Sequence, residues 1–452
     1  MALPRKLLAP QLPLGDDSFE KRTVDLYAAS ANSQTSYTAG DRLLFQFSAY
    51  ARRFIDFSKS FIKFDLTVDN GGTTAADGKM RMYDNLPIFE RMQVRVGSKN
   101  IEDVDSYSTL EKIMIQTTKT SFDRSGGEIL GDFTKDSGSL VGDISVADVN
   151  SVKKTYIKQL YSGVLGNSEY LFPIHRLNAG NALEIELTLA SLVNTLMFAV
   201  DKGSTATSQS SYSISNVKFQ VVLLKVSDSF FNKYNALSNN NELILPMTTY
   251  RRHVASVAVG QTEPVIFIND NAKNLKRTYT VFREPRRGFQ AASTAAGSAT
   301  PLVVTPDKHE PRFLKGFKSD DATTQNQLLR YQFKYMSRNF PEVPAECRLG
   351  DQNIFIANLL TNIGVDMTKS LPHIAQTYND GVILCQDFTY SEDDMVNGLN
   401  VNASGSPLIL ELKFAGTGTA TNIETFSEST MNLVLDQHGN ASIVQKTNMN
   451  VE

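Results

Sequence analysis

The chain carries one pattern of alternating apolar and polar residues at two places that lie half its length apart. The copies are residues 183–190 (LEIELTLA) and residues 408–415 (LILELKFA), so they start 225 positions apart (408 − 183) in a chain of 452 residues. Apolar side chains recur at every second position, and successive side chains of a strand point to opposite faces of a sheet. Each copy therefore predicts a β-strand with one buried face, and Leu187 and Leu412 are expected to occupy equivalent buried positions.

The segments upstream of these two strands repeat in the same order. Residues 94–101 (VRVGSKNI) and 333–340 (FKYMSRNF) each predict a strand that enters a polar turn containing Ser, a basic residue and Asn. Apolar residues at spacings of three and four then predict a helix over 105–118 and another over 351–363.

Two further strands precede each of these turns. Residues 43–47 and 61–66 are expected to form a strand pair, and residues 265–268 and 275–282 are expected to form its counterpart. The order strand, strand, strand, turn, helix, strand therefore occurs twice. This repetition predicts a duplicated β domain.

Proline content and polar insertions indicate the domain boundaries. Three prolines, Pro4, Pro10 and Pro13, exclude a regular helix or a central strand near the N-terminus and predict an extended arm. Gly-, Ser- and Asp-rich residues 121–155 and Pro- and Ala-rich residues 284–326 are expected to be surface insertions. The expected organisation is an arm at 1–22, a first domain at 23–228, a linker at 229–242, a second domain at 243–437 and a tail at 438–452.

Composition places the chain in the ordinary soluble class. A length of 452 residues suits two domains of roughly 200 residues each. With 21% charged residues and a net charge of −3, the chain lacks the basic excess of a protein that binds nucleic acid specifically. Its two cysteines, Cys347 and Cys385, are too few for a disulfide framework, which favours a reduced, intracellular site of folding. No apolar run approaches the roughly 20 residues that a membrane span needs.

A search for catalytic motifs finds none that is complete. The five histidines form no HExxH or His-x-His pair, which argues against a metal site and against a duplicated cupin. Residues 72–80 resemble a phosphate-binding loop but have the wrong spacing, so a hairpin loop is expected there. Asp103 with Asp105 and the acidic residues at 391–394 could bind a cation, but a helix N-terminus and a solvated loop are the expected roles. No catalytic, cofactor-binding or metal-binding residue is therefore predicted, and the chain is not expected to be an enzyme.

Short basic clusters are the remaining candidates for contact with phosphate. They are scattered among carboxylates without interleaved aromatic residues, so we expect solvated strand ends and no specific nucleic-acid binding. The clusters are Arg52–Arg53, Lys153–Lys154, Arg251–His253 and Arg283–Arg287.

Four segments of the chain carry a resemblance through their order and spacing, namely residues 89–103 (FERMQVRVGSKNIED), 171–177 (LFPIHRL), 183–187 (LEIEL) and 397–400 (NGLN). From about Arg42 onward, the chain resembles the double jelly-roll major capsid proteins of tailless icosahedral double-stranded DNA viruses. It is most similar to the branch that contains virophages and polinton-like viruses.

The resemblance implies an all-β fold of two tandem jelly-roll β-sandwiches with short helices and loop insertions. It implies a major capsid protein whose two rolls stand side by side and whose homotrimers form pseudo-hexagonal capsomers that tile an icosahedral shell. The implied partners are neighbouring capsomers, penton and minor capsid proteins and, in some members, an inner membrane. The protein would be assembled inside the host cell and reside in the virion, and the modest insertions argue against tall surface towers.

Two other functions remain open on sequence grounds. A β-sandwich protein that binds a receptor or carbohydrate would also lack catalytic motifs, although the absence of Trp removes the usual sugar-stacking residue. A duplicated β-sandwich hydrolase would need paired carboxylates roughly 5 to 10 Å apart on facing strands, which a sequence does not reveal.

Overall fold

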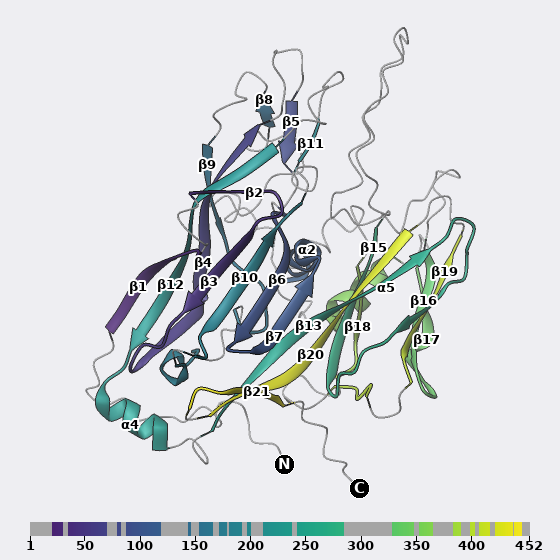
Figure 1. The fold of residues 1–452 in the computed structure, drawn as a ribbon. Coiled ribbons are helices and arrows are strands. Elements are labelled where there is room, and N and C mark those ends of the chain that lie inside the picture. Colours follow the sequence, from purple (N-terminus) through teal and green to yellow (C-terminus); the bar gives the residue numbers. More distant parts are fainter. Residues whose placement is uncertain are drawn as a thin grey trace.

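The computed structural model shows two β-sandwiches that lie side by side (Figure 1). The described residues are 20–29, 35–69, 79–82, 87–118, 143–145, 153–165, 171–178, 180–191, 197–199, 211–236, 242–283, 328–347, 352–364, 383–389, 398–402, 406–415, 421–436 and 438–444. No helix among these residues is long and apolar enough to cross a membrane.

Domain 1 contains two antiparallel sheets, which we name A and B. Sheet A has the order β1-β12-β4-β9 with β2 also paired to β12, and sheet B has the order β3-β10-β6-β7. The strands are Glu20–Tyr27 (β1), Ser36–Thr38 (β2), Arg42–Phe47 (β3), Arg53–Asp69 (β4), Phe89–Val96 (β6), Lys99–Asp105 (β7), Lys153–Lys158 (β9), Leu183–Leu189 (β10) and Ser211–Lys225 (β12). A separate three-stranded sheet at one end of the domain comprises Lys79–Met82 (β5), Asp143–Ser145 (β8) and Met197–Ala199 (β11).

Domain 2 repeats this arrangement in two sheets, which we name C and D. Sheet C has the order β13-β20-β15-β18 with β21 also paired to β20, and sheet D has the order β14-β19-β16-β17. The strands are Leu243–Val257 (β13), Val265–Ile268 (β14), Leu275–Arg283 (β15), Leu328–Tyr335 (β16), Arg338–Glu346 (β17), Ile383–Asp387 (β18), Leu408–Phe414 (β19), Thr421–Leu435 (β20) and Ala441–Val444 (β21). The helices of the chain are Tyr107–Thr118 (α2), Ile174–Arg176 (η3, a 3-10 helix), Asp228–Ala236 (α4) and Gln352–Asn362 (α5).

The sheet orders confirm the duplication that the sequence predicts. The two strands of the repeated motif, β10 and β19, share the same alternation of buried and half-buried residues. Leu187 is fully buried and Leu412 nearly so, which confirms their expected equivalence. The turn between β6 and β7 and the turn between β16 and β17 are each followed by one of the predicted helices, α2 or α5.

In both domains the inner faces of two sheets pack against each other through large apolar side chains. In domain 1, the rings of Phe45 on β3 and Phe219 on β12 lie 5.6 Å apart. In domain 2, the rings of Phe282 on β15 and Phe414 on β19 lie 5.9 Å apart. Alternating apolar residues on two facing sheets produce such a core, as in other β-sandwiches.

The predicted strand pairs at 43–47 with 61–66 and at 265–268 with 275–282 are wrong. Strand β3 belongs to sheet B and β4 to sheet A, and likewise β14 belongs to sheet D and β15 to sheet C. The chain therefore crosses from one sheet to the other between these strands. Both strands of each predicted pair are apolar because each contributes side chains to the core from its own sheet. The pattern of apolar residues does not distinguish two strands in facing sheets from two strands paired in one sheet.

Several predicted loops and boundaries contain regular structure. Strand β9 occupies residues 153–158, so the end of the insertion expected at 121–155 is an edge strand. Lys153 and Lys154, expected to be a solvated strand end, are the first two residues of this strand, and lysines are common on edge strands. Strand β1 begins in the expected arm, α4 lies in the expected linker and β21 lies in the expected tail. The domain boundaries stay predictions, and the insertion expected at 284–326 lies outside the described residues.

Candidate functional site

Two of the three described histidines, His175 and His253, are packed against other protein groups. His175 is packed edge-on against the rings of Phe54 and Phe231, and burial lowers its pKa to about 4. His253 lies 3.6 Å from the carboxylate of Asp270. Throughout the described part of the chain, no three His, Cys, Asp or Glu side chains are grouped as metal ligands would be.

The two cysteines are buried in domain 2 and are not joined by a disulfide. Burial raises the pKa of Cys385 well above its ordinary value, which favours the thiol over the reactive thiolate. Cys385 therefore has the properties of a small apolar core residue and lacks those of a nucleophile.

Two of the carboxylates considered as cation ligands, Asp103 and Asp105, interact with an arginine side chain of the protein. Asp103 accepts two hydrogen bonds from the Arg91 guanidinium, at 2.8 and 2.6 Å, and Asp105 lies 3.1 Å from the same group. Both aspartates lie in strand β7, so the expected position at a helix N-terminus is wrong by a few residues. The acidic residues at 391–394 lie outside the described residues, as does the loop expected at 72–80 except for its last two residues, which begin strand β5.

Arginines of three basic clusters form ion pairs where the structure describes their side chains. Arg52 pairs with Asp228, Arg251 lies 3.0 Å from Asp270, and Arg252 lies 3.2 Å from Glu424. Arg283, predicted to be a solvated strand end, is instead buried and lies 3.0 Å from Glu424. Arg52 therefore contributes to the structure of domain 1, and the other three arginines contribute to domain 2 and its contacts.

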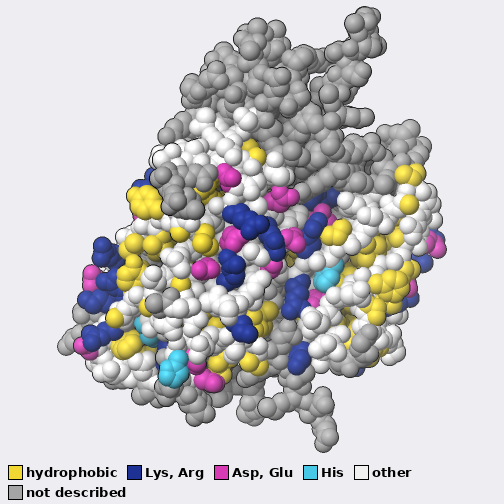
Figure 2. All heavy atoms as spheres, viewed as in Figure 1, with side chains coloured by type: hydrophobic (Ala, Val, Ile, Leu, Met, Phe, Trp, Pro, Cys, Tyr) yellow, Lys and Arg dark blue, Asp and Glu magenta, His cyan; other side chains and the backbone are white. Residues whose placement is uncertain are grey.

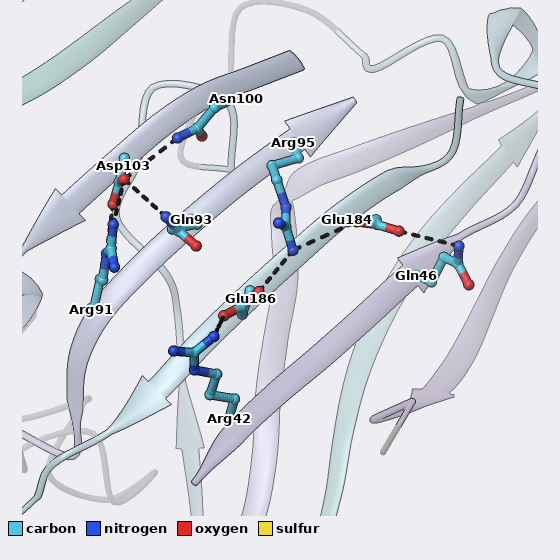
Figure 3. Close-up of polar contacts among 9 residues, drawn as sticks. All are labelled: Arg42, Gln46, Arg91, Gln93, Arg95, Asn100, Asp103, Glu184 and Glu186. Atoms are coloured by element: carbon cyan, nitrogen blue, oxygen red, sulfur yellow. Dashed lines mark hydrogen bonds and ion pairs between the residues drawn. The ribbon is translucent and has the colours of Figure 1, made fainter. Parts of the chain in front are cut away.

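The outer face of sheet B carries a network of charged side chains (Figure 3). Arg95 lies 2.7 Å from Glu186 and 3.7 Å from Glu184, and Arg42 lies 3.3 Å from Glu186. Gln46 donates a hydrogen bond of 3.3 Å to Glu184. The network forms the patch of basic and acidic side chains at the centre of the face seen in Figure 2. Because opposite charges alternate across the strands, this face is polar but nearly neutral.

The equivalent face of sheet D keeps one ion pair and replaces its neighbours by apolar residues. The two registers place Lys334 and Glu411 where Arg95 and Glu186 lie in sheet B, and this pair is 2.8 Å apart. Phe267 and Ile409 take the places of Gln46 and Glu184. Phe267 is 60% exposed, and yellow side chains gather over this sheet in Figure 2. A groove of about 360 Å³ lies beside it, lined in part by Glu411 and Lys334.

The two domains meet at a buried joint that has no equivalent within either sandwich. One hydrophobic cluster includes Phe64 and Leu187 of domain 1 together with Phe426 and Leu433 of domain 2. Arg283 of β15 donates a hydrogen bond of 2.8 Å to Thr109 in the first turn of α2. Helix α2 lies between the two sandwiches in Figure 1. The joint therefore combines a shared apolar core with polar contacts.

Close backbone packing and a buried carboxyl group complete the joint. A Cβ atom on Gly163 would lie only 1.2 Å from the carbonyl oxygen of Thr248 on β13, so the two backbones touch. Glu102 of β7 accepts a hydrogen bond of 3.3 Å from the N–H of Gly163. Burial raises the pKa of Glu102 to about 7, although amide donors, among them Tyr250 of domain 2, oppose the increase.

Glu102→Gln is expected to remove a pH dependence from the free energy of unfolding. The pKa of Glu102 rises from 4.5 to about 7 on folding, so the native state binds its proton more tightly. The contribution of this bound proton to the free energy of unfolding is complete below about pH 4.5. It is lost as the pH rises to about 7, a change of roughly 3 kcal/mol. Above pH 7 the glutamine variant should therefore be the more stable protein.

Urea denaturation of both proteins between pH 4.5 and 8 measures this effect. His175 has its pKa lowered to about 4 and changes stability in the opposite direction over part of this range, so only the difference between the two proteins at each pH is informative. A difference that is constant from pH 5 to pH 8 contradicts the assignment to Glu102.

Comparison with known proteins identifies the fold. No family model matches the chain, and no curated protein matches it by sequence. Solved structures do match: the quasi-atomic model of the PBCV-1 virus capsid superposes with a TM-score of 0.64 at 12% identity, covering 97% of this chain and all of that one. The Faustovirus major capsid protein has a TM-score of 0.60 at 9% identity, with 95% and 92% of the chains covered. The Sputnik virophage structure has a TM-score of 0.57 at 10% identity, with 98% and 94% covered.

These similarities confirm the predicted fold class. The chain has the double jelly-roll fold found in major capsid proteins of icosahedral viruses, including the virophage branch that the sequence resembles. The sequence did not reveal the residues of the joint. Gly163 lies in a short loop with no motif of its own, and Glu102 and Arg283 look like solvated charges until residues distant in the sequence are placed beside them.

Proposed function

We propose that the chain is a major capsid protein, a structural subunit whose homotrimers form the pseudo-hexagonal capsomers of an icosahedral virion shell. The observation that carries the proposal is the duplicated jelly-roll fold, with its two copies fixed to each other by a buried joint. The PBCV-1 virus capsid model and the Faustovirus major capsid protein share this fold over nearly their whole length.

The duplication supplies the geometry that a hexagonal array requires. Three copies of a chain with two similar domains present six similar units around one axis. Closed symmetry also covers sheet edges that an isolated β domain would leave open to uncontrolled association. The trimer interface would then exceed the roughly 2,000 Å² that is usual for obligate assemblies.

The two alternatives receive no specific support. A hydrolase needs an arranged pair of carboxylates, whereas the acidic residues around Asp103 and Glu186 are occupied by arginines. A carbohydrate-binding protein needs exposed aromatic rings that stack on sugars. The exposed aromatic rings among the described residues are Tyr27 and Tyr50 on domain 1 and Phe267 on domain 2, so they do not form one group.

The remaining partners follow from the same proposal. Neighbouring capsomers, penton and minor capsid proteins would contact the outer surfaces of the trimer, and an inner membrane could lie beneath the shell. The N-terminal arm, with Arg5 and Lys6 beside Leu7 and Leu8, has the composition of a segment that docks on a neighbouring subunit or near that membrane. The genome would not be bound specifically.

Electron microscopy in negative stain tests the proposal. The purified full-length chain should form particles with a hexagonal outline, alone or tiled into sheets and shells. A field of single two-domain particles at micromolar concentration contradicts it.

A further inference from the structure

The linker between the two domains contains a short helix that docks on domain 1. Helix α4 follows β12 and precedes β13, and in Figure 1 it lies at the lower end of domain 1, outside both sheets. Ser227 caps its N-terminus by accepting a hydrogen bond of 3.3 Å from the N–H of Phe230. A helix of nine residues is too short to be stable alone in water, so α4 depends on the surface beneath it.

The surface beneath α4 is centred on a histidine. His175 of η3 packs edge-on against Phe231 of the helix, with ring centroids 4.8 Å apart, and its ring lies 6.0 Å from that of Tyr234. It also packs edge-on against Phe54 of β4, at 4.8 Å, and Phe54 contacts Tyr234 at 5.2 Å. Three aromatic rings therefore pack around the imidazole, and two of them belong to α4.

The surroundings of His175 suit a neutral imidazole. Its Nδ1 lies 3.3 Å from the carbonyl oxygen of Arg53, and because a carbonyl only accepts, Nδ1 carries the proton and donates the hydrogen bond. Its Nε2 is buried and has no hydrogen-bond partner. A second proton on Nε2 would therefore create a positive charge whose N–H group is buried without an acceptor, which is costly.

Cations accompany His175 on two of the elements that meet here. Arg176 follows it in η3, and Arg53 belongs to β4. Burial lowers the pKa of His175 to about 4, and the charge of Arg176 adds to the decrease, whereas the hydrogen bond to Arg53 opposes it. Tyr234 does not titrate below pH 7, because burial raises its pKa to about 12. A positive charge on the imidazole is therefore disfavoured while α4 is docked.

The carboxylates of the neighbouring elements are paired with other groups. Asp228, in the first turn of α4, is paired with Arg52. Asp56 of β4 lies 3.1 Å from Lys59. Neither carboxylate is placed to compensate a charge on His175, so protonation of the imidazole acts directly against the docking of α4.

We infer that α4 is an acid-sensitive latch, in which protonation of His175 releases the helix from domain 1. Phe231 and Tyr234 leave with the helix, so the imidazolium becomes accessible to water. The link between the domains then becomes a flexible connection. The joint between the sandwiches consists of other residues and stays closed. The inference does not depend on the proposed function.

The release is expected to grow as the pH falls from 7 to 4.5. The pKa of His175 is about 4 while the helix is docked and returns to its ordinary value of 6.5 when the helix has left. Docking is therefore strongest above pH 6.5 and weakens as the pH falls towards 4. The ratio of released to docked helix should rise about 50-fold between pH 7 and pH 4.5, because the released state binds the proton more tightly.

Hydrogen–deuterium exchange of the full-length chain, followed by mass spectrometry, measures the release. After correction for the intrinsic pH dependence of exchange, the amides of residues 228–236 should lose protection about 50-fold between pH 7 and pH 4.5. Residues 218–225 of β12, which are paired with β1 on one side and β4 on the other, supply the internal control. Their protection should be unchanged.

Two variants separate the charge of His175 from its packing. His175→Phe keeps an aromatic ring, His175→Asn keeps a donor for the carbonyl oxygen of Arg53, and neither new side chain titrates. In both variants the protection of α4 should be independent of pH. Asp228→Asn is the matched control, since it removes the pair with Arg52 but keeps the histidine, and it should lose protection in acid as the wild type does.

Three results would overturn the inference. The first is a wild-type α4 that keeps its protection at pH 4.5. The second is a loss of protection as steep in both His175 variants as in the wild type. The third is a loss that extends equally to β12, because it would show that acid unfolds domain 1 as a whole.

Discussion

Gly163→Ala is expected to lower the free energy of unfolding by at least ~3 kcal/mol, the upper end of the range for overpacked cores. The added methyl carbon would lie 1.2 Å from the carbonyl oxygen of Thr248, and neither backbone can move without opening the joint. Opening the joint would also remove the hydrogen bond from Gly163 to Glu102 and expose part of the shared apolar cluster. The effect of one methyl group should therefore extend to both domains.

Chemical denaturation followed by intrinsic tyrosine fluorescence measures this loss. Gly180→Ala is the matched control, because a Cβ atom there would meet nothing closer than the Asn178 side chain at 3.5 Å. The control should change stability by no more than about 0.5 kcal/mol. Equal stability of the Gly163→Ala variant and the wild type contradicts the close packing at the joint.

Lys158→Met is expected to destabilise domain 1 by roughly 3 to 5 kcal/mol, because it leaves the carboxylate of Glu111 buried without its cation. The Lys158 Nζ lies 2.8 Å from Glu111 Oε2, and both side chains are 0% exposed. Adding Glu111→Leu to the same chain should recover most of this loss, since replacing a buried ion pair with apolar residues is often neutral.

Lys225→Met is the control for Lys158→Met. Lys225 lies 3.2 Å from Glu20, but these side chains are 49% and 58% exposed. An ion pair exposed to this degree contributes less than about 1 kcal/mol. Urea denaturation of the three variants and the wild type gives the comparison. Similar losses for Lys158→Met and Lys225→Met contradict the special role of the buried pair.

The local pattern of residues predicted the repeated strands and helices, their order and their duplication, but it did not predict β9, α4 or β21. Alternation along residues 183–190 identified β10, and its repeat at 408–415 identified β19. The pattern did not assign strands to sheets, because pairing joins residues far apart in the sequence, as when Phe61 of β4 lies opposite Gln220 of β12. An apolar strand has the same alternation in whichever sheet it lies.

The residues that join the domains could not be predicted for the same reason. Arg283 follows an ordinary strand and precedes further basic residues, which made a solvated cluster the natural interpretation. Its burial depends on Thr109 and Glu424, which lie in other parts of the chain. Glu102 likewise gives no local signal, because its proton affinity is set by the contact of β7 with domain 2.

Sedimentation equilibrium of the purified full-length protein at sub-micromolar concentration tests the central claim most directly. A shell subunit built from two joined jelly rolls should sediment as a single species with three times the mass of the 50.0 kDa chain. A well-folded monomer that neither trimerises nor assembles as its concentration is raised would contradict the assignment of this chain as a capsid protein.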